Sequence, residues 1–314
     1  MTDAPRTAIL ERLRTGPAGG PELASILDIS RAAVWKHMEQ LRHGGVQIDA
    51  TEAGYVLTAM DGVTQATLSA GAEFDWEVVF EPQMGSTNVR ARAIIEAGGG
   101  DCAVVTDEQT AARGRRGRAW TAPEGGIWLS VIHTPALGTH ALPLYTLAAA
   151  VAVTALLREL GVSPQIKWPN DIEVTDPPAG KVAGILSEHH GELDGAGRVI
   201  IGIGVNLNTA RELLPAEATT VSAIVGACDR RAATQQLLEQ LQASIKTLEG
   251  PGGSPAITSR WREDAVTLGR RVAVELPTER VEGEAVDITD TGALVIETTA
   301  GRRHVTAGDC VHLR

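Results

Sequence analysis

The sequence has little cysteine and no long apolar segment. Its three cysteines, Cys102, Cys228 and Cys310, are odd in number and widely separated, so they resemble neither a zinc site nor a disulfide framework. The longest apolar run, at 147–157, is about half of the roughly 20 residues that a membrane span requires. We therefore expect reduced thiols, a buried helix at this run, no membrane association and a cytoplasmic location.

Positive charge is scarce overall but concentrated in one segment. The formal net charge of −11 argues against a protein that coats polyanions with its whole surface. Yet residues 113–118 read RGRRGR, between a strand predicted to end near Gln109 and another that begins near Gly126. Glycines let a loop expose N–H groups to an anion, and guanidinium groups match carboxylates and phosphates. We call this segment the arginine loop. It predicts a binding site for a polyphosphate or an activated carboxylate. The alternative is a solvated basic loop, which the adjacent Trp120 disfavours.

The common nucleotide-binding motifs are missing. No G-x-x-x-x-G-K-[ST] phosphate loop occurs, and AGKVAG at 179–184 lacks both its first glycine and its hydroxyl. The stretch GIGVN at 202–206 lacks the third glycine of a dinucleotide-binding motif. Any nucleotide must therefore be bound by residues outside these motifs.

The first 60 residues show the order of elements of a winged helix. Helical spacing of apolar residues predicts helices at 4–15, 20–27 and 30–42, and two short alternating segments predict a hairpin after them. The expected buried residues are Ile9, Leu10 and Leu13 in the first helix, Leu23, Ile26 and Leu27 in the second, and Val34, Met38 and Leu41 in the third. Ser30 is expected to cap the third helix.

The third helix carries a candidate DNA-reading face. Its early residues would reach base edges in a major groove, and those opposite the buried stripe are Arg31, Ala32, Trp35 and Lys36. Acidic residues balance the basic ones in this segment, although phosphate contacts usually supply much of DNA affinity. A small helical interaction module is therefore the alternative.

The rest of the chain contains runs of strands with a few helices. This order favours an α+β fold with a mixed central sheet, in which 181–190 and 198–208 form a hairpin about a turn at 191–197. From residue 269 onward, short strands separated by turns predict a small β-barrel. The expected domains are 1–62, 63–268 and 269–314, with a linker at 60–70.

Isolated polar motifs add candidates for the central domain. Lys181 opens an apolar strand, where its ammonium is either simply exposed or meets a carboxylate or phosphate. KWPND at 167–171 brings Lys167, Asn170 and Asp171 into one turn, where Asp171 suits hydrated magnesium, a ribose or a cap of its own turn. GSTN at 85–88 is by itself an ordinary helix N-cap.

These motifs together closely resemble the biotin protein ligases of the bifunctional kind that also repress the biotin operon. The resemblance rests on ARGRRGRAW, KWPND, GKVAGILSE, GIGVNLN and STN, preceded by SRAAVWKHMEQLR, and it covers almost the whole chain. It implies a winged helix-turn-helix domain, a central class II synthetase-like biotin ligase domain and an SH3-like C-terminal β-barrel. It also implies that biotin and MgATP give biotinyl-5′-adenylate, which a lysine of a biotin carboxyl carrier domain then attacks.

The resemblance assigns roles to residues of this sequence. Arg113, Arg115 and Lys181 would be catalytic. Biotin would contact Ser86, Thr87, Asn88, Gln109, Arg113, Gly114, Arg115 and Lys181. The nucleotide would contact Arg116, Arg118, Trp120, Lys167, Asn170, Asp171, Asn206 and Asn208, with Trp120 stacked on adenine and Asp171 as a magnesium ligand. The winged helix would bind operator DNA, and a homodimer is expected.

One position departs from the family, and two other functions remain open. The family loop usually begins with glycine where this chain has Ala112, which would be strained if the position needs a positive φ. A lipoate protein ligase would share the fold and the adenylate chemistry, although the arginine loop disfavours it. A non-catalytic biotin-sensing repressor is the other alternative, but it should lack Lys181 or the arginines.

Overall fold

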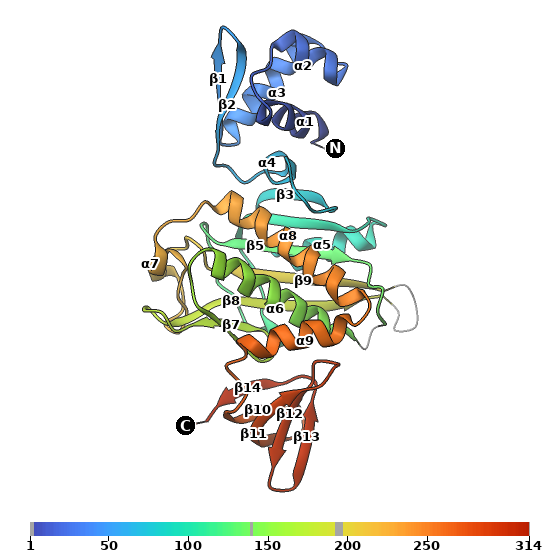
Figure 1. The fold of residues 1–314 in the computed structure, drawn as a ribbon, viewed down its shortest axis with the longest axis vertical. Coiled ribbons are helices and arrows are strands. Elements are labelled where there is room, and N and C mark those ends of the chain that lie inside the picture. The colour runs from blue at the N-terminus through green and yellow to red at the C-terminus, as the bar shows by residue number, and fades with distance from the viewer. Residues whose placement is uncertain (1–2, 139–140, 192–196, 314) are drawn as a thin grey trace.

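The chain forms three units stacked along one axis, as a computed structural model shows (Figure 1). The structure describes residues 3–138, 141–191 and 197–313. A helical unit with a hairpin lies at the N-terminal end, a seven-stranded sheet with helices lies in the middle, and a five-stranded sheet lies at the C-terminal end. The predicted α+β fold is confirmed.

Three helices and a hairpin form the N-terminal unit. They are α1 (Ala4–Arg14), α2 (Gly20–Leu27), α3 (Arg31–His43), β1 (Val46–Thr51) and β2 (Gly54–Met60). Ser30 caps α3 as predicted, because its side chain accepts a hydrogen bond from the backbone N–H of Ala33. The prediction that Ile26 is buried is wrong, since this side chain is 55% exposed. The stripe of α2 instead follows Leu23 and Leu27, four residues apart, which pack into the core.

The segment predicted as a linker holds a helix, α4 (Gln65–Ser69). Thr64 and Thr67 form a capping box at its start, in which each side chain bonds the backbone N–H of the other residue. Ala66 and Ala70 pack into the N-terminal core, whereas Leu68 packs into the central core. The predicted linker at 60–70 is therefore folded, because both cores bury part of this segment.

The central sheet is mixed, as expected. Its strands are β3 (Glu77–Met84), β4 (Cys102–Gln109), β5 (Ile127–His133), β6 (Pro164–Lys167), β7 (Asp171–Val174), β8 (Gly180–His190) and β9 (Arg198–Val205). They lie in the order β3-β4-β5-β9-β8-β7-β6, with β3 and β4 parallel and the other neighbours antiparallel. Strands β8 and β9 pair as the predicted hairpin, whose turn lies largely outside the described residues.

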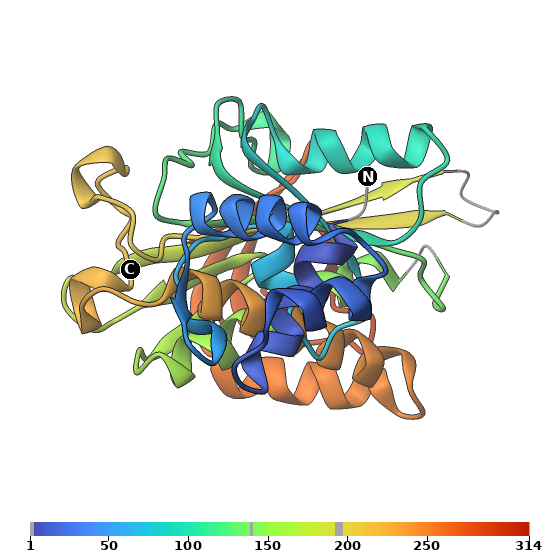
Figure 2. The ribbon, with the colours of Figure 1, turned by 90° about the horizontal axis from the view of Figure 1, so that it is seen from above.

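Helices cover the two faces of this sheet unequally (Figure 2). On one face lie α6 (Leu142–Glu159), α8 (Arg230–Glu249) and α9 (Gly253–Asp264), and on the other lies α5 (Thr87–Glu96). By length and composition α6 would also suit a membrane span, but it is mostly buried against the sheet, α8 and α9, as predicted for the apolar run at 147–157. The sequence analysis missed α8 and α9, although Leu237, Leu241, Ile245 and Leu248 form a helical stripe. Shorter helical segments are η1 (Arg115–Gly117), η3 (Arg211–Leu213) and α7 (Ser222–Val225).

The C-terminal unit is a five-stranded antiparallel sheet that shares its core with the central unit. Its strands are β10 (Arg271–Glu275), β11 (Arg280–Ile288), β12 (Leu294–Thr298), β13 (Gly301–Val305) and β14 (Asp309–His312), in the order β13-β12-β11-β10-β14. Val272, Ile288 and Leu294 belong to the same continuous apolar cluster as α6 and α9. Arg262 of α9 also pairs with Asp287 at 2.7 Å. The unit is therefore fixed against the central sheet.

We expect Leu68→Ala to lower the free energy of unfolding of the central unit by about 2–5 kcal/mol, because it removes a fully buried side chain between two packed units. Urea unfolding followed by the fluorescence of the buried Trp128 and Trp261 measures this loss. Val311→Ala serves as the control, because Val311 is 53% exposed and its truncation should change stability by no more than about 0.5 kcal/mol. Equal losses in the two variants would show that α4 does not couple the cores.

Candidate functional site

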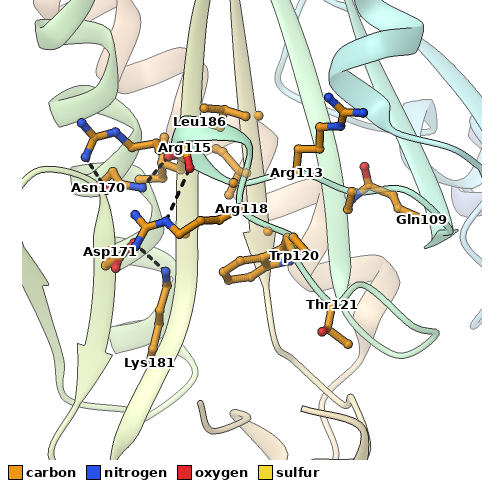
Figure 3. A pocket seen from close by; sticks show the side chains of 18 of the residues that line it. Gln109, Arg113, Arg115, Arg118, Trp120, Thr121, Asn170, Asp171, Lys181 and Leu186 are labelled. Atoms are coloured by element: carbon orange, nitrogen blue, oxygen red, sulfur yellow. Dashed lines mark hydrogen bonds and ion pairs between the residues drawn. The ribbon is translucent and has the colours of Figure 1, made fainter. Parts of the chain in front are cut away.

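A cleft opens on the α5 side of the central sheet (Figure 3). Along β9, Ile200, Gly202 and Gly204 point to this side, while Ile201 and Ile203 belong to the apolar cluster around α6. The start of α5, the loop at 112–121 and the first half of β8 form the walls. Segments that are distant in sequence thus meet over the middle of the sheet.

Glycines make the floor of the cleft flat enough to hold an aromatic ring. Gly184 of β8 and Gly204 of β9 are register partners, and a Cβ atom at either position would lie within about 3.1 Å of the Trp120 ring. Trp120 therefore rests directly on the backbone of two strands. Its predicted contact with adenine stays a prediction, while the ring already has Lys181 Nζ 4.9 Å from its centroid.

The arginine loop is anchored at both ends and curled in the middle. Bridges join Gln109 to Ala122 and Arg113 to Ala119, and the turn between them is η1. Ala112 shows no positive φ and hence none of the strain that such a φ would cause, since the positive φ values of the loop occur at Arg116 (55°) and Gly117 (74°), and Ala112 is buried against Trp128. Alanine at this position thus fills an apolar contact with an ordinary backbone conformation.

Counter-charges from another domain hold the arginines. Arg116 and Arg118 both pair with Asp309 of β14, at 3.0 and 2.9 Å. Arg115 donates to Asn170 Oδ1 at 3.2 Å and to the carbonyl of Gly308 at 3.1 Å. Burial lowers the pKa of the Arg115 guanidinium, an effect that Asp309 and Asp171 oppose. An arginine nevertheless stays charged, so Arg115 presents an incompletely neutralised cation to the cleft.

Lys181 and Asp171 face each other at the end of the cleft. Their Nζ and Oδ1 atoms are 2.7 Å apart, and Figure 3 shows the pair beside Trp120. Asp171 also lies close enough to Arg115 to affect its pKa. The Asp171 carboxylate therefore holds the Lys181 and Arg115 cations close together. An anionic ligand that binds there would add further negative charge.

The residues present do not make a magnesium site of their own. Among the residues that the structure describes, no group of three or more His, Cys, Asp or Glu side chains is placed to hold a metal ion. Asp171, the predicted ligand, is already paired with Lys181. Mg²⁺ commonly binds through one or two carboxylates together with substrate phosphates, so a nucleotide would have to bring the ion with it.

The opposite end of the cleft is polar and buried. The backbone N–H of Thr87 donates to Gln109 Oε1 at 2.8 Å, which leaves the Gln109 amide NH₂ directed away from this contact. Thr87 and Asn88 are buried and linked through Ser130 Oγ, which lies 2.7 Å from Thr87 Oγ1 and 2.6 Å from Asn88 Oδ1. Ser86 occupies the N-cap position of α5, as expected for GSTN, but its side chain makes no capping hydrogen bond. Its hydroxyl lines the cleft instead.

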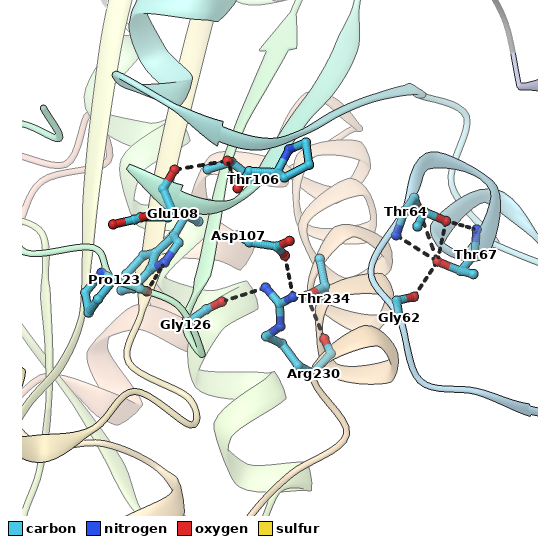
Figure 4. Close-up of polar contacts among 12 residues, drawn as sticks. Gly62, Thr64, Thr67, Thr106, Asp107, Glu108, Pro123, Gly126, Arg230 and Thr234 are labelled. Atoms are coloured by element: carbon cyan, nitrogen blue, oxygen red, sulfur yellow. Dashed lines mark hydrogen bonds and ion pairs between the residues drawn. The ribbon is translucent and has the colours of Figure 1, made fainter. Parts of the chain in front are cut away.

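One ion pair and one hydrogen bond from a single arginine hold the two ends of the segment between Gln109 and β5. Asp107 lies two residues before Gln109 and pairs with Arg230 at the start of α8 (Figure 4). The same guanidinium donates to the carbonyl of Gly126 at 3.4 Å. The two ends of the segment that carries the arginine loop, 107 and 126, are thus attached to one side chain.

Most predicted site residues line this one cleft. They are Ser86, Thr87, Asn88, Gln109, Arg113, Gly114, Arg115, Arg118, Trp120, Asn170, Asp171, Lys181 and Asn206. Three others lie outside its described lining. Arg116 turns to Asp309, Lys167 pairs with Glu173 at 2.9 Å, and the amide of Asn208 bonds the backbone N–H and C=O of Cys228. Their predicted nucleotide contacts are therefore not supported by the geometry.

Sequence reasoning missed the apolar and glycine lining. Gly184, Gly202 and Gly204 form the floor, and the segment from Leu214 to Ala218 contributes one edge. The signal for the floor was present, since glycines two residues apart in a strand open one face of a sheet. The GIGVN stretch is thus not a dinucleotide motif but part of the floor of the cleft.

The cleft is equipped to bind anions rather than to act as a nucleophile. It combines Arg113, Arg115, Arg118 and Lys181 with few acidic groups, and no histidine or cysteine occurs among its described lining residues. Burial raises the pKa of the Cys102 and Cys310 thiols to about 11, which disfavours the reactive thiolate form at neutral pH. Such a site can crowd a carboxylate and a phosphate together and stabilise the charge that develops between them.

The predicted DNA-reading face is solvent-exposed. Arg31, Ala32, Trp35 and Lys36 lie on the outside of α3, opposite the buried Val34 and Met38. Trp35 is 59% exposed, which is unusual for a tryptophan without a partner. The face is therefore free to contact a ligand outside the described chain.

Three sequence families match the three units. Residues 6–56 match the family described as HTH domain, residues 95–206 match the Biotin/lipoate A/B protein ligase family, and residues 267–313 match the Biotin protein ligase C terminal domain. Together they cover each of the units seen in the structure.

Curated and solved relatives agree with these matches. The chain is 32% identical to the bifunctional ligase/repressor BirA of Bacillus subtilis (strain 168), over 92% of each chain. It is 36% identical to a biotin–[acetyl-CoA-carboxylase] ligase of Mycobacterium tuberculosis, covering 74% of this chain and 87% of that one. The solved biotin protein ligase from Aquifex aeolicus, in complex with biotin and ATP, superposes with a TM-score of 0.64 at 26% identity, covering 77% of this chain and all of that one.

We expect Asp309→Asn to loosen the arginine loop without unfolding the protein. Exposed ion pairs contribute only about 0–1 kcal/mol each, so the melting temperature should change little, while amide hydrogen exchange at 112–120 should accelerate several-fold. Exchange measured by mass spectrometry tests this result. Glu279→Gln is the matched control, because it breaks an exposed pair with Arg303 in the same domain without touching the loop. Unchanged exchange in Asp309→Asn would contradict the idea that Asp309 holds the loop.

Proposed function

The chain belongs to the biotin protein ligase family, and we propose that it adenylates biotin with ATP and transfers the biotinyl group to a lysine of a biotin carboxyl carrier domain. Its helix-turn-helix domain makes it a biotin-responsive transcriptional repressor as well. The observation that carries the ligase function is the convergence of Arg115 and Lys181, from distant segments, on one cleft whose other end is polar and buried. This arrangement suits a molecule with a carboxylate at one end and a urea at the other.

The first step joins two anions. The biotin carboxylate oxygen attacks the α-phosphorus of ATP, a P–O bond to pyrophosphate breaks, and a mixed anhydride with AMP remains. Arg113, Arg115 and Lys181 offset the repulsion between carboxylate and phosphate, and their contribution grows as charge concentrates in the transition state. Asp171 orients the Lys181 ammonium until the ligands arrive.

The second step needs little from the protein beyond position. The amine of the carrier lysine attacks the carbonyl carbon of the anhydride, AMP leaves with the electron pair of the broken C–O bond, the nitrogen releases one proton to solvent, and an amide forms. AMP is a good leaving group, so no serine or cysteine nucleophile is required. Mg²⁺ is proposed to enter as MgATP and to screen the polyphosphate, in keeping with the scarcity of metal ligands in the cleft.

A lipoate protein ligase is the second candidate, since one matching family includes both activities in its description. Thr87 and Gln109 argue against it, because the buried Thr87 and the partly buried Gln109 suit the hydrogen-bonding urea of biotin. The dithiolane ring of lipoate would leave them unpaired, at about 1–3 kcal/mol for each group. A non-catalytic repressor is disfavoured because Lys181 and the arginines are all present.

The repressor role rests on the winged helix. Its exposed α3 face would enter a major groove, and a homodimer would place two such faces on a two-fold symmetric operator. We propose that this dimer forms and that the protein works in the cytoplasm, where carrier domains and DNA are both accessible. Sedimentation with and without biotin and ATP tests the dimer.

One experiment separates the candidates. The protein is incubated with MgATP, a carrier domain and either biotin or lipoate, and pyrophosphate release is measured together with the intact mass of the carrier. We expect pyrophosphate and one added biotinyl group with biotin, and neither with lipoate. Modification by lipoate alone would establish the second candidate, and no reaction with either acid would leave only the repressor.

We expect Lys181→Ala to slow single-turnover adenylation by about 10–150-fold, because a charge-assisted contact contributes about 1.5–3 kcal/mol. Rapid-quench measurement of biotinyl-adenylate tests this. Lys167→Ala is the matched control, since Lys167 belongs to the same sheet but pairs with Glu173 outside the cleft. It should adenylate within about twofold of the parent, and an equal defect in both variants would contradict the role of Lys181.

Charge reversal on the winged helix should separate the two activities. Arg31→Glu combined with Lys36→Glu should abolish retention on promoter DNA in a gel-shift assay, because two phosphate-attracting charges become repulsive. Carrier biotinylation should remain at the parental rate, since α3 lies at the far end of the molecule from the C-terminal unit and outside the cleft. Loss of ligase activity in this variant would show that the winged helix serves catalysis instead.

A further inference from the structure

Beneath the polar end of the cleft lies a chain of hydrogen bonds that ends on a charged residue. Asn88 Nδ2 donates to Glu188 Oε2 at 2.7 Å and to the carbonyl of Leu186 at 3.3 Å. Asn88 Oδ1 lies 2.6 Å from Ser130 Oγ, which in turn lies 2.7 Å from Thr87 Oγ1. Glu188 also accepts from Arg92 at 3.1 Å, which holds the carboxylate in place.

The charge of Glu188 fixes the direction of every bond in this chain. A carboxylate only accepts hydrogen bonds, so the Asn88 atom that faces it must be the NH₂ group and the atom that faces Ser130 must be the oxygen. That oxygen cannot donate, so the single hydroxyl proton of Ser130 goes to Asn88. Ser130 therefore has no proton to give to Thr87.

The same logic sets what Thr87 offers to a ligand. Its own hydroxyl proton goes to Gln109 Oε1 at 3.2 Å. This acceptor is a protein atom, so Thr87 Oγ1 presents a lone pair to the cleft that it lines. A lone pair at this point matches a ligand N–H group and repels a ligand oxygen.

We propose that Glu188 is a positioning and specificity-determining residue that sets this polarity and thereby selects a urea N–H. This proposal rests on the proposed function, because it assigns the polar end of the cleft to the urea ring of biotin. It also changes the role of Asn88, which was expected to contact biotin. Its amide is occupied by Glu188, Leu186 and Ser130, so it acts through Thr87 instead.

The burial of these residues supports a hydrogen-bond chain with one fixed direction. Ser130 is fully buried and Asn88 is 7% exposed, so a misdirected hydrogen bond in this chain would stay unsatisfied. A Cβ atom at Gly202 would lie 2.1 Å from Asn88 Oδ1, so β9 leaves room for the amide at this point. Glu188 itself is 32% exposed and forms the outer end of the hydrogen-bond chain.

The test compares biotin with two cyclic carbamate analogues, each with one ureido N–H replaced by oxygen. Dissociation constants are measured by titration calorimetry without ATP. The parent protein should bind biotin much more tightly than the analogue whose oxygen faces Thr87. In Glu188→Gln, Arg92 holds the new amide oxygen and the new NH₂ faces Asn88, so the chain can reverse and Thr87 can donate. The preference for biotin over that analogue should fall about tenfold.

Two further variants complete the test. Ser130→Ala breaks the chain in the middle and should lower the same preference. Glu81→Gln is the matched control, because Glu81 of β3 pairs with Arg90, which lies on α5 like Arg92 but away from Asn88. This variant should keep the parental preference. A parental preference in Glu188→Gln and Ser130→Ala would overturn the inference. Absence of biotin binding in the parent would instead contradict the proposed function.

Discussion

The mutual repulsion of clustered cations is the constraint on which this site depends. Three arginines of the loop and Lys181 approach one cleft, and without counter-charges they would drive the loop away from the sheet. Asp309 and Asp171 offset this repulsion from two different units of the chain. Because β14 carries Asp309, the position of the loop depends on the C-terminal unit, which explains why that unit shares a continuous core with α6 and α9. A domain that is distant in sequence is thus part of the anion site.

The two ends of the cleft differ in how their buried polar groups are stabilised. At the anion end, charges are only partly neutralised, so a ligand that supplies negative charge is favoured. At the polar end, hydrogen bonds between neutral groups are nearly complete, and selectivity depends on the direction of a few protons. A molecule with a carboxylate and a urea meets both demands at once, whereas a simple fatty acid would meet only the first.

Local patterns in the sequence predicted most elements, and the resemblance supplied most of the site. The helices at 4–15 and 30–42 and the β8–β9 hairpin follow from periodicity, which depends on neighbours in the chain. Neither source could place Arg116 or Asn208, because their partners, Asp309 and Cys228, are chosen by tertiary packing. The same holds for α4, whose alanines and leucine have meaning only once two cores exist. At Ala112 the family pattern suggested a position that needs glycine. The structure shows that this position accepts a side chain, while Arg116 has a positive φ.

The cation cluster also bears on how the acceptor lysine reacts. An amine is nucleophilic only without its proton, yet a lysine in water is protonated at neutral pH. An ammonium that enters beside Arg115 and Lys181 meets like charges and loses hydration, and both effects lower its pKa. In the proposed reaction the acceptor would thus lose its proton to solvent as it approaches the cations. This effect would let a cleft with no histidine among its described lining residues support aminolysis, and it would give the arginines a second role after the adenylate has formed.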